Sequence, residues 1–403
     1  MTIFLFSTYS VTKEMDVMEL IINKEIMNVQ ASVIREMKSL ADTYEDVIDF
    51  TLGEPHLYHQ TYEVIKDTLM KRLSIDSLGY ANYYGVLELR EAISTYCREE
   101  FNQVYNPKSE ILVTTGVSES ISAVLKTILN PGDEVIVFNP SFTLYSSNIK
   151  MYGGKVVVYD IIENQMKVDK KVLSSLISNQ TKAIIINSPC NPTGQLLSAD
   201  DLDSIYDCIK DKPIFILSDE IYRELVFDQP DYHSISDYND LRERLFIMNG
   251  FSKSLAMTGW RVGYVMGPAT YIKRVSIVHQ NMVASISTVS QYAAIEAMKH
   301  PEITENLCEV YRQNRDYAYE TLKPYFKNII RPDGAFYMYL DVSNYQMSSE
   351  TFALMLLREQ RVALVPGIAF ENKDSGYVRL SYCCNFEVLK KGINRILNFG
   401  KIL

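Results

Sequence analysis

Several polar side chains stand shortly after apolar segments in the middle of the chain. Lys253 follows "LFIMNG" and Asn191 follows "AIIINSP". Asp219 and Tyr222 both come after "IFILS". A lysine amine attacks a carbonyl carbon when burial or a neighbouring cation lowers its pKa. Small serines flank Lys253, and Arg261 is eight residues further on. The pattern therefore predicts that Lys253 forms an imine with a carbonyl compound in a narrow pocket.

A phosphate site is predicted at the start of a helix. Gly116-Val117-Ser118 separates "EILVTT" from an expected helix. The free N–H groups and the dipole of a helix N-terminus bind phosphate. A single cofactor would use the lysine for an aldehyde, Arg261 and the helix for a phosphate, and Asp219 for a ring nitrogen. Together these requirements predict pyridoxal phosphate.

The elements that position these residues alternate along the chain. Strands are predicted at 110–115, 133–140, 155–160, 182–189, 214–220 and 244–251, and helices at 18–44, 86–101, 118–129, 141–153, 269–300 and 302–326. The strand segments are continuous Val and Ile runs, which predicts a parallel or mixed sheet with helices on both faces. Ligands of such sheets bind at the carboxyl ends of the strands, where the polar residues fall.

Towards the C-terminus the pattern changes. Residues 334–342 and 377–383 alternate between apolar and polar side chains, as half-buried antiparallel strands do, and a helix closes the chain. A short strand is also expected in 48–55. We therefore predict an N-terminal extension (1–15), a large cofactor-binding α/β domain (61–305), and a smaller α+β domain built from residues 16–60 and 306–403.

The composition limits the class of protein. The chain has 403 residues, 47% hydrophobic and 22% charged, with a formal net charge of −10. This is typical of a globular protein, and the acidic balance argues against nucleic acid or an anionic membrane as a partner. No apolar run approaches the roughly 20 residues of a membrane span, and the N-terminus lacks the features of a signal peptide. Six scattered cysteines without a CxxC pair predict a reduced, cytoplasmic protein.

A metal site is not expected. His56 and His59 are three residues apart, but Pro55 lies beside them and no cysteine or carboxylate stands at ligand spacing.

Six segments together resemble the class I/II aminotransferases of fold type I. In chain order they are "TLGEP", "YANYYGVLELREAI", "SPCNPTG", "SDEIY", "SKSLAMTGWRVGY" and "YVRLSY", and the resemblance extends from about residue 18 to the end. It implies a mostly parallel central sheet with a smaller α+β domain. It also implies pyridoxal 5'-phosphate as cofactor, transamination between an amino acid and a 2-oxo acid, and a homodimer.

The resemblance also implies roles for individual residues. Lys253 matches the lysine that carries the cofactor, and Asp219 matches the aspartate that keeps the pyridine nitrogen protonated. Tyr222 and Asn191 match residues beside the phenolic oxygen of the cofactor. Phe142 matches the aromatic residue that stacks on its ring.

Other matched residues bind the phosphate or the substrate. The phosphate contacts are Arg261, Ser252 and the backbone N–H groups of Val117 and Ser118, with Tyr80 reaching the phosphate of the neighbouring subunit. Arg379 matches the arginine that binds the substrate α-carboxylate, helped by Asn191 and the backbone of Gly53. Two positions depart from or vary within the family: Gly250 replaces a serine found in some members, and Cys190 lies inside the asparagine motif.

The reaction and the substrate stay open at this point. Fold type I also contains β-eliminating lyases, although "MTGWRVGY" is more typical of aminotransferases. It contains cofactor-binding sensors as well, which need a winged helix before the first expected helix. The segments "NGFSKSLAMTGWRVGY" and "RPDGAFYMYLDV" resemble aromatic and N-acetyl-diaminopimelate aminotransferases of bacteria. Neutral aromatic donors with 2-oxoglutarate as acceptor, in a ping-pong cycle, are the first expectation.

Overall fold

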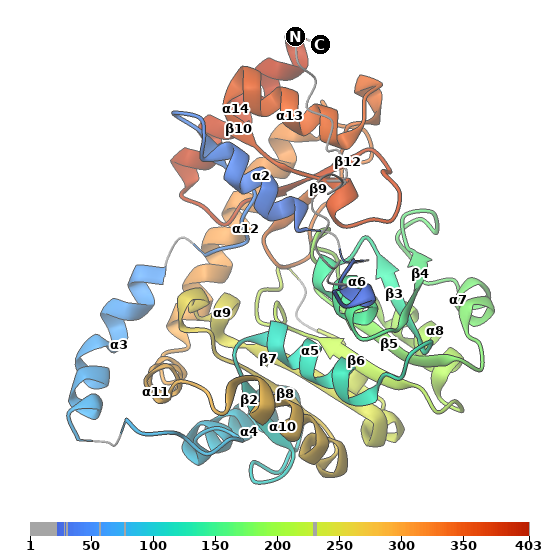
Figure 1. The fold of residues 1–403 in the computed structure, drawn as a ribbon. Coiled ribbons are helices and arrows are strands. Elements are labelled where there is room, and N and C mark those ends of the chain that lie inside the picture. The colour runs from blue at the N-terminus through green and yellow to red at the C-terminus, as the bar shows by residue number, and fades with distance from the viewer. Residues whose placement is uncertain are drawn as a thin grey trace, which may run out of the picture.

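The computed structural model describes residues 22–402, except 28, 30, 56, 57, 76, 77 and 229–231. The expected N-terminal extension (1–15) and His56 therefore lie outside the described residues. Figure 1 shows two parts: a large sheet with its helices, and a smaller group of C-terminal elements. The N-terminal helix α2 (Val33–Ala41, blue) lies beside the C-terminal elements, so both ends of the chain meet in the smaller part.

The large sheet contains seven strands within the described ranges, in the order β2-β8-β7-β6-β5-β3-β4. Their bounds are β2 Ile111–Thr114, β3 Glu134–Asn139, β4 Lys155–Asp160, β5 Thr181–Asn187, β6 Phe215–Asp219, β7 Leu245–Gly250 and β8 Gly263–Met266. Strands β3 to β7 pair in parallel, and β8 is antiparallel to both of its neighbours. The prediction of a parallel or mixed sheet is confirmed. Strand β8 was not predicted, because the stretch "MTGWRVG" that leads into it was interpreted as a turn.

The helices of this part are α3 (Tyr58–Leu73), α4 (Leu87–Phe101), α5 (Val117–Ile128), α6 (Thr143–Met151), α7 (Lys170–Leu176), α8 (Ala199–Ile209), α9 (Phe251–Ser254), α10 (Ala269–Val283) and α11 (Thr288–Ala297), with 3-10 helices η1 (Ile235–Asp237), η2 (Asn239–Arg244) and η3 (Thr258–Trp260). Every residue of β2, β7 and β8 is buried, so these strands are covered on both faces. Burial on both faces explains why the sequence of these strands is continuously apolar and does not alternate. Only the edge strand β4 is largely half-exposed.

Two of the predicted helices are interrupted. The single helix predicted at 269–300 is wrong: α10 ends at Val283, Ala284 has a positive φ of 62°, and α11 starts after Ser287. The hydroxyl of Ser287 accepts a hydrogen bond from the Ser290 N–H, which caps the second helix. Apolar periodicity continues across this break, so it hid the local serine cap. The helix predicted at 18–44 is likewise divided, into α1 (Lys24–Met27) and α2.

The smaller part is built on β9 (Tyr337–Asp341), β11 (Val365–Pro366) and β12 (Tyr377–Ser381), which pair in antiparallel fashion. Beside it, β1 (Ile48–Asp49) pairs in parallel with β10 (Val362–Ala363), which joins the N-terminal segment to the C-terminal one. Its other elements are α12 (Glu302–Leu322), α13 (Ser349–Gln360), α14 (Phe386–Ile402), η4 (Ser343–Tyr345) and η5 (Gly367–Ala369). The prediction of a small α+β unit from both chain ends is confirmed.

The prediction that its strands are half-buried is wrong. All residues of β9 and β12 are buried. On one face Met338, Leu340, Val378 and Leu380 pack into the main hydrophobic core. The alternate positions do not reach solvent either. Tyr337 contacts Tyr222 of the large part, whereas Tyr339 and Tyr377 belong to a buried cluster with Val365 and Phe370. Arg379 and Tyr339 are opposite each other in the register, and both are fully or almost fully buried.

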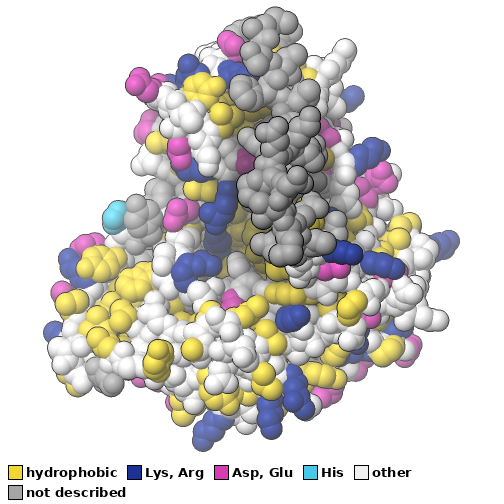
Figure 2. Space-filling view, in the orientation of Figure 1, with side chains coloured by type: hydrophobic (Ala, Val, Ile, Leu, Met, Phe, Trp, Pro, Cys, Tyr) yellow, Lys and Arg dark blue, Asp and Glu magenta, His cyan; other side chains and the backbone are white. Residues whose placement is uncertain are grey.

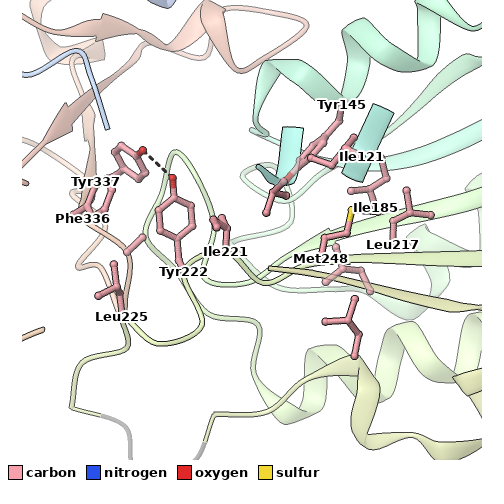
Figure 3. Packing of buried hydrophobic residues seen from close by; sticks show 14 of the residues in the cluster. Ile121, Tyr145, Ile185, Leu217, Ile221, Tyr222, Leu225, Met248, Phe336 and Tyr337 are labelled. Atoms are coloured by element: carbon pink, nitrogen blue, oxygen red, sulfur yellow. Dashed lines mark hydrogen bonds between the residues drawn. The ribbon is translucent and has the colours of Figure 1, made fainter. Parts of the chain in front are cut away.

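The seam between the two parts is closed by hydrogen bonds. Tyr222, which follows β6, and Tyr337 of β9 share a hydrogen bond of 2.9 Å between their hydroxyls (Figure 3). Nearby, the Asp333 N–H donates to the Gly194 carbonyl over 2.9 Å. The carboxyl ends of the large-sheet strands therefore face the smaller part. In the part of the chain that the structure describes, no helix is long and apolar enough to cross a membrane.

Candidate active site

Lys253 lies at the carboxyl end of β7, in the short helix α9. Its Nζ donates a hydrogen bond of 2.6 Å to the Gly53 carbonyl. Burial lowers the pKa of this amine to about 8, the nearby Cys383 opposes the shift, and the cations Arg261 and Arg379 reinforce it. A lysine with this pKa exists partly as the free amine near neutral pH, which is the form that attacks a carbonyl carbon.

Asp219 ends β6 and is 3% exposed. Burial raises the pKa of its carboxyl to about 6, against two hydrogen bonds that favour the charged form. These come from the Tyr145 hydroxyl at 2.7 Å and from the Ile221 N–H at 3.2 Å. Tyr145 belongs to α6 and was not predicted as a site residue. Its aromatic neighbour Phe142, which was predicted, caps the same helix and meets the Tyr145 ring edge-on at 5.8 Å.

A cradle for an anion lies where β2 passes into α5. Gly116 precedes the helix with a φ of 73°, and the first N–H groups of the helix belong to Val117 and Ser118. A Cβ on Gly116 would lie 2.7 Å from a terminal nitrogen of Arg261. Only a glycine at position 116 leaves room for the Arg261 guanidinium, which therefore lies next to the N-terminus of α5. The predicted phosphate contacts are thus brought together.

Glycines also hold the lysine segment close to the cradle. A Cβ on Gly263 would lie 2.7 Å from the Val117 nitrogen, and a Cβ on Gly250 would lie 2.8 Å from the Gly263 Cα. In this backbone a serine at position 250 would collide with β8, so the departure at Gly250 has a packing cause. The predicted contact Ser252 is buried two residues later.

A buried contact between Glu119 and His279 supports the cradle on the side of α10. Glu119, in the first turn of α5, accepts a hydrogen bond of 2.5 Å from the Thr115 N–H. Its other oxygen is 2.6 Å from Nδ1 of His279, a fully buried residue of α10. No sequence signal predicts this contact, because the two residues are 160 positions apart along the chain.

Arg379 of β12 is 2% exposed, and its guanidinium stands over the rings of Tyr337 and Phe370 at 4.4 and 4.7 Å. One terminal nitrogen donates to Asn191 Oδ1 over 2.9 Å, and the other donates to the Thr51 carbonyl. Among the described residues, its Nε has no hydrogen-bond partner. Burial lowers the pKa of this guanidinium. A buried cation with an unpartnered N–H is a site for an anionic ligand.

Backbone and amide contacts connect these groups. The Asn191 N–H donates to Asn187 Oδ1, and Asn187 Nδ2 donates to the Asp219 carbonyl, both over 2.9 Å. The carbonyls of Thr51 and Gly53 accept the bonds of Arg379 and Lys253. Hydrogen bonds therefore connect the backbone of Asp219 to Arg379 through Asn187 and Asn191. Residues 51–53 hold both Arg379 and Lys253 through their carbonyls.

The 51–54 stretch was predicted only at Gly53. A Cβ there would lie 1.8 Å from the Tyr337 hydroxyl, so glycine is required by close packing. Glu54 accepts a hydrogen bond of 2.7 Å from Thr258, and its carbonyl accepts one of 3.3 Å from the Cys383 thiol. Thr258 belongs to η3 and Cys383 follows β12, and no local motif connects either residue to Glu54.

Tyr80 is the one predicted site residue that lies apart. Its side chain is 95% exposed, outside the cluster around Lys253. The others meet at the carboxyl ends of the sheet strands. The described residues fit a ligand with an aldehyde, an anionic group and a ring nitrogen: they offer a partly neutral amine, a glycine-lined cradle beside Arg261, and the buried carboxylate of Asp219.

Comparison with known proteins agrees with this geometry. Residues 45–396 match the family model described as aminotransferase class I and II. A Bacillus subtilis (strain 168) protein named "Probable N-acetyl-LL-diaminopimelate aminotransferase" is 37% identical over 380 residues, 94% of this chain and 95% of that one. "Aromatic-amino-acid aminotransferase 2" of Thermococcus litoralis is 32% identical over 372 residues, 91% of this chain and 95% of the relative.

Solved structures agree as well. The aspartate aminotransferase of Thermotoga maritima superposes with a TM-score of 0.87 at 32% identity, covering 94% of this chain and 99% of the other. The match extends through both parts of the fold and through the cluster around Lys253. The chain belongs to the class I/II aminotransferases of fold type I, and it is a pyridoxal-phosphate-dependent transaminase.

Proposed function

We propose that the enzyme transfers the α-amino group of an amino acid to 2-oxoglutarate, in two half-reactions that use one pocket. The observation that carries this proposal is the pairing of Lys253 with Arg379. Both donate to carbonyls of the same stretch, at Gly53 and Thr51. Because they are held together in this way, the amine can act on the α-carbon of a small molecule while the guanidinium binds its α-carboxylate.

Lys253 is the proposed base. When bound, pyridoxal phosphate supplies an aldehyde that takes up the amino group and a ring that withdraws electrons from the substrate α-carbon. The Lys253 amine removes the proton from the α-carbon of the donor and returns a proton to the α-carbon of the acceptor. A pKa of about 8 suits both directions, because the amine is then neither fully protonated nor strongly basic.

Asp219 and Tyr222 are the proposed partners of the ring. The Asp219 carboxylate keeps a proton on the pyridine nitrogen by an ionic hydrogen bond, for which Tyr145 orients it. The Tyr222 hydroxyl and Asn191 would hold the phenolic oxygen, and Phe142 would cover the ring. The N–H groups of Val117 and Ser118, with Ser252 and Arg261, would hold the phosphate.

Arg379 is the proposed carboxylate receptor for both substrates. A guanidinium forms two parallel hydrogen bonds with a carboxylate, which fixes the direction of the α-carbon. Asn191 and Thr51 already hold its two terminal nitrogens, so the plane of the fork is set before the substrate arrives. Preorganisation of this kind reduces the entropy lost on binding.

For the donor we propose neutral aromatic amino acids. The guanidinium of Arg379 is already flanked by Tyr337 and Phe370, and the relative from Thermococcus litoralis is named for aromatic amino acids. A donor with a second carboxylate is the alternative, because the Bacillus subtilis relative is named for N-acetyl-LL-diaminopimelate and the Thermotoga maritima structure for aspartate.

We also propose a homodimer. Segment 62–87 exposes a series of large apolar side chains on the side of the molecule where α3 lies (Figure 2): Tyr62, Val64, Met70, Ile75, Leu78, Tyr80, Tyr83 and Leu87. Apolar surface of this extent is expected to be covered by a partner. In such a dimer, Tyr80 of one chain would reach the phosphate cradle of the other chain.

We further place the enzyme in the cytoplasm, since all six cysteines are free thiols.

A donor screen tests the reaction. Each common amino acid, and N-acetyl-LL-diaminopimelate, is offered with 2-oxoglutarate, and glutamate formation is measured. We expect phenylalanine and tyrosine to give the highest kcat/KM, with parallel double-reciprocal lines when both substrates are varied. Preference for aspartate or N-acetyl-LL-diaminopimelate would select the second candidate. Intersecting lines would exclude the two-stage cycle, and release of ammonia and pyruvate from cysteine without glutamate would indicate a lyase.

A further inference from the structure

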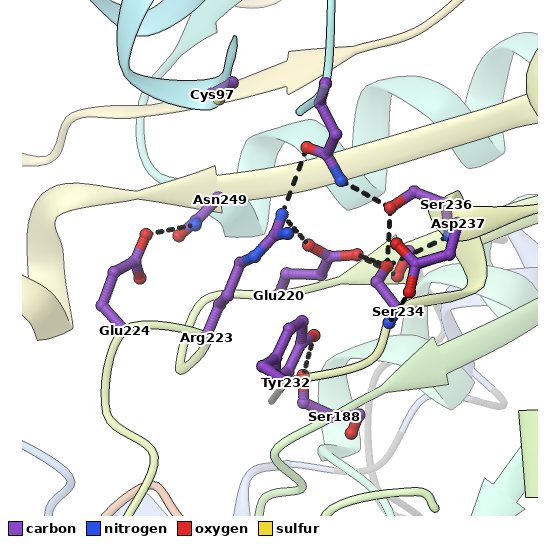
Figure 4. A network of polar contacts seen from close by, with 12 residues as sticks. Cys97, Ser188, Glu220, Arg223, Glu224, Tyr232, Ser234, Ser236, Asp237 and Asn249 are labelled. Carbon is purple, nitrogen blue, oxygen red and sulfur yellow. Dashed lines mark hydrogen bonds and ion pairs between the residues drawn. The ribbon is translucent and has the colours of Figure 1, made fainter. Parts of the chain in front are cut away.

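Two segments carry the residues that act on the substrate, and a pair of side chains joins them. The segment after β6 carries Tyr222 and, two residues later, Glu224. Strand β7 ends with Asn249 and Gly250, and the segment that follows carries Lys253. Figure 4 shows Glu224 and Asn249 facing each other between these segments. Asn249 Nδ2 donates to Glu224 Oε1 over 2.9 Å.

The same asparagine also holds the backbone in front of the lysine. Its Oδ1 accepts a hydrogen bond of 2.6 Å from the Gly250 N–H. Gly250 itself cannot move towards β8, because its Cα region already packs against Gly263. The Asn249 side chain therefore ties the start of the Lys253 segment to Glu224, and both of its polar atoms are used.

The surroundings of Glu224 enclose its carboxylate. The Tyr96 hydroxyl of α4 donates to Oε1 over 3.3 Å, and the Cys308 thiol of α12 donates to the Glu224 carbonyl over 3.0 Å. Oε2 is buried and has no partner among the described residues. Other titratable neighbours are Arg223 on its own segment, Tyr232, Cys97 of α4 and Tyr264 of β8.

An enclosed carboxylate with an unpartnered oxygen is unfavourable for folding. Burial raises the pKa of Glu224 to about 7, which reflects the same cost. Glu220, four residues earlier, differs: its carboxylate is fully paired with Arg223, Ser218 and Ser234. The paired carboxylate of Glu220 can be explained by its contribution to stability. The incompletely paired carboxylate of Glu224 cannot be explained in that way.

We propose that Glu224 is a positioning residue for the transamination. Through Asn249 it fixes the backbone at Gly250, and so it sets where the Lys253 amine stands relative to Tyr222. The inference rests on the role proposed above for Lys253. A displacement of the amine by a fraction of an ångström slows proton transfer without removing any group that touches the substrate.

Four variants of the holoenzyme test this link. Glu224→Ala and Asn249→Ala remove it. Glu224→Gln keeps an oxygen that accepts from Asn249 and is the conservative rescue. Tyr96→Phe is the matched control, because it removes the other donor to Glu224 Oε1 and leaves Asn249 untouched. The readouts are hydrogen exchange at the Gly250 amide, the pH midpoint of the cofactor absorbance, kcat and KM.

We expect Glu224→Ala and Asn249→Ala each to accelerate exchange at Gly250 about tenfold, as for the loss of one hydrogen bond. Both should shift the absorbance midpoint by at least about half a pH unit and lower kcat about tenfold with little change in KM. Glu224→Gln and Tyr96→Phe should match the wild type. The double alanine variant should be no worse than either single one, because both substitutions break the same link.

A lowered melting temperature in Glu224→Ala, with unchanged exchange, midpoint and kcat, would show a structural role only and overturn the proposal. If that variant fails to fold, Asn249→Ser decides the matter with Glu224 intact. Exchange at Gly250 requires no turnover. A wrong assignment of Lys253 would instead appear in the wild-type enzyme, as cofactor fixed to a different lysine.

Discussion

At the scale of single residues, burial shifts the pKa of an amine down and the pKa of a carboxyl up, so that both values approach neutral pH. The pKa of Lys253 falls to about 8 and that of Asp219 rises to about 6. Desolvation is the largest cause of both shifts, because the charged forms of both groups are disfavoured in the same dry site. Both residues stand at strand ends, where the sheet supplies rigid support.

Lys253→Ala should abolish covalent attachment of the cofactor. Borohydride reduction followed by peptide mapping should find the cofactor on Lys253 in the wild-type enzyme and on no lysine in the variant. Turnover should fall by several orders of magnitude, because the variant lacks both the attachment point and the base. Reduced cofactor on another lysine of the wild type would contradict the assignment.

Asp219→Asn should retain bound cofactor and lose most of kcat, because a neutral amide does not hold a proton on the ring nitrogen. Tyr145→Phe is the informative companion. It removes one of the hydrogen bonds that oppose the rise in the pKa of Asp219, so this pKa should rise further while the carboxyl stays in place. A milder loss of kcat is therefore expected in Tyr145→Phe, measured at saturating substrate. Near-normal kcat in Asp219→Asn would move the role to another residue.

Arg379→Lys keeps a positive charge and loses the fork. We expect it to weaken the binding of donor and acceptor alike, by about 2 to 5 kcal/mol if the ion pair is desolvated in the complex. Steady-state kcat/KM for each substrate, measured separately, checks this. A loss confined to one of the two substrates would show that they do not share the receptor.

At the scale of elements, the proposed phosphate cradle is formed more by backbone than by side chains. It needs the turn at Gly116, the start of α5 and the closely packed β7 and β8. Three glycines permit this packing, and in each case the missing Cβ would meet a specific neighbour. The Glu119–His279 pair then fixes the turn from the side of α10.

Gly116→Ala should weaken cofactor binding about tenfold or more, since its Cβ would meet Arg261 in addition to the strain of a positive φ. Gly132→Ala is the control, because Gly132 also has a positive φ, of 91°, but open space around its Cβ position. The control should lose about 1 kcal/mol of unfolding free energy and keep its cofactor affinity. Cofactor titration and thermal unfolding of both variants separate the two effects. Equal affinities would show that the contact with Arg261 is not needed.

At the scale of the whole molecule, the proposed active site lies in the seam between the large sheet and the smaller part. Arg379 comes from the smaller part and Lys253 from the larger one, so the pocket exists only when the two are packed together (Figure 1). The exposed apolar side chains of segment 62–87 lie outside this seam, on the surface that we propose to be the dimer interface.

If Tyr80 serves the partner's cradle, the single variants Tyr80→Phe and Lys253→Ala should complement each other. Mixing the two inactive or weakened homodimers under exchange conditions should yield heterodimers with one intact site and recover up to about half of the wild-type activity per site. Light scattering should give the mass of two chains. A fully active monomer would refute the shared site.

The expected chemistry and most of the helices and strands could be predicted from the amino-acid sequence. Lys253, Asp219 and Asn191 stand after apolar runs, and the position of a residue at a strand end is a local property that spacing reveals. The mixed sheet followed from the same runs, because a strand buried on both faces has no polar alternation. The six motifs then identified the family and the roles implied for its residues.

Contacts between groups that are distant along the chain became apparent only in the folded molecule. Tyr145 with Asp219, Thr51 with Arg379, and Glu224 with Asn249 are separated by 74, 328 and 25 positions, and nothing local distinguishes them from other tyrosines, threonines and glutamates. Burial of β9 and β12 on both faces also depends on the seam, which no single segment encodes. Local sequence sets backbone conformation and polarity, whereas pKa shifts and hydrogen-bond partners arise from the packing of segments that the chain brings together only on folding.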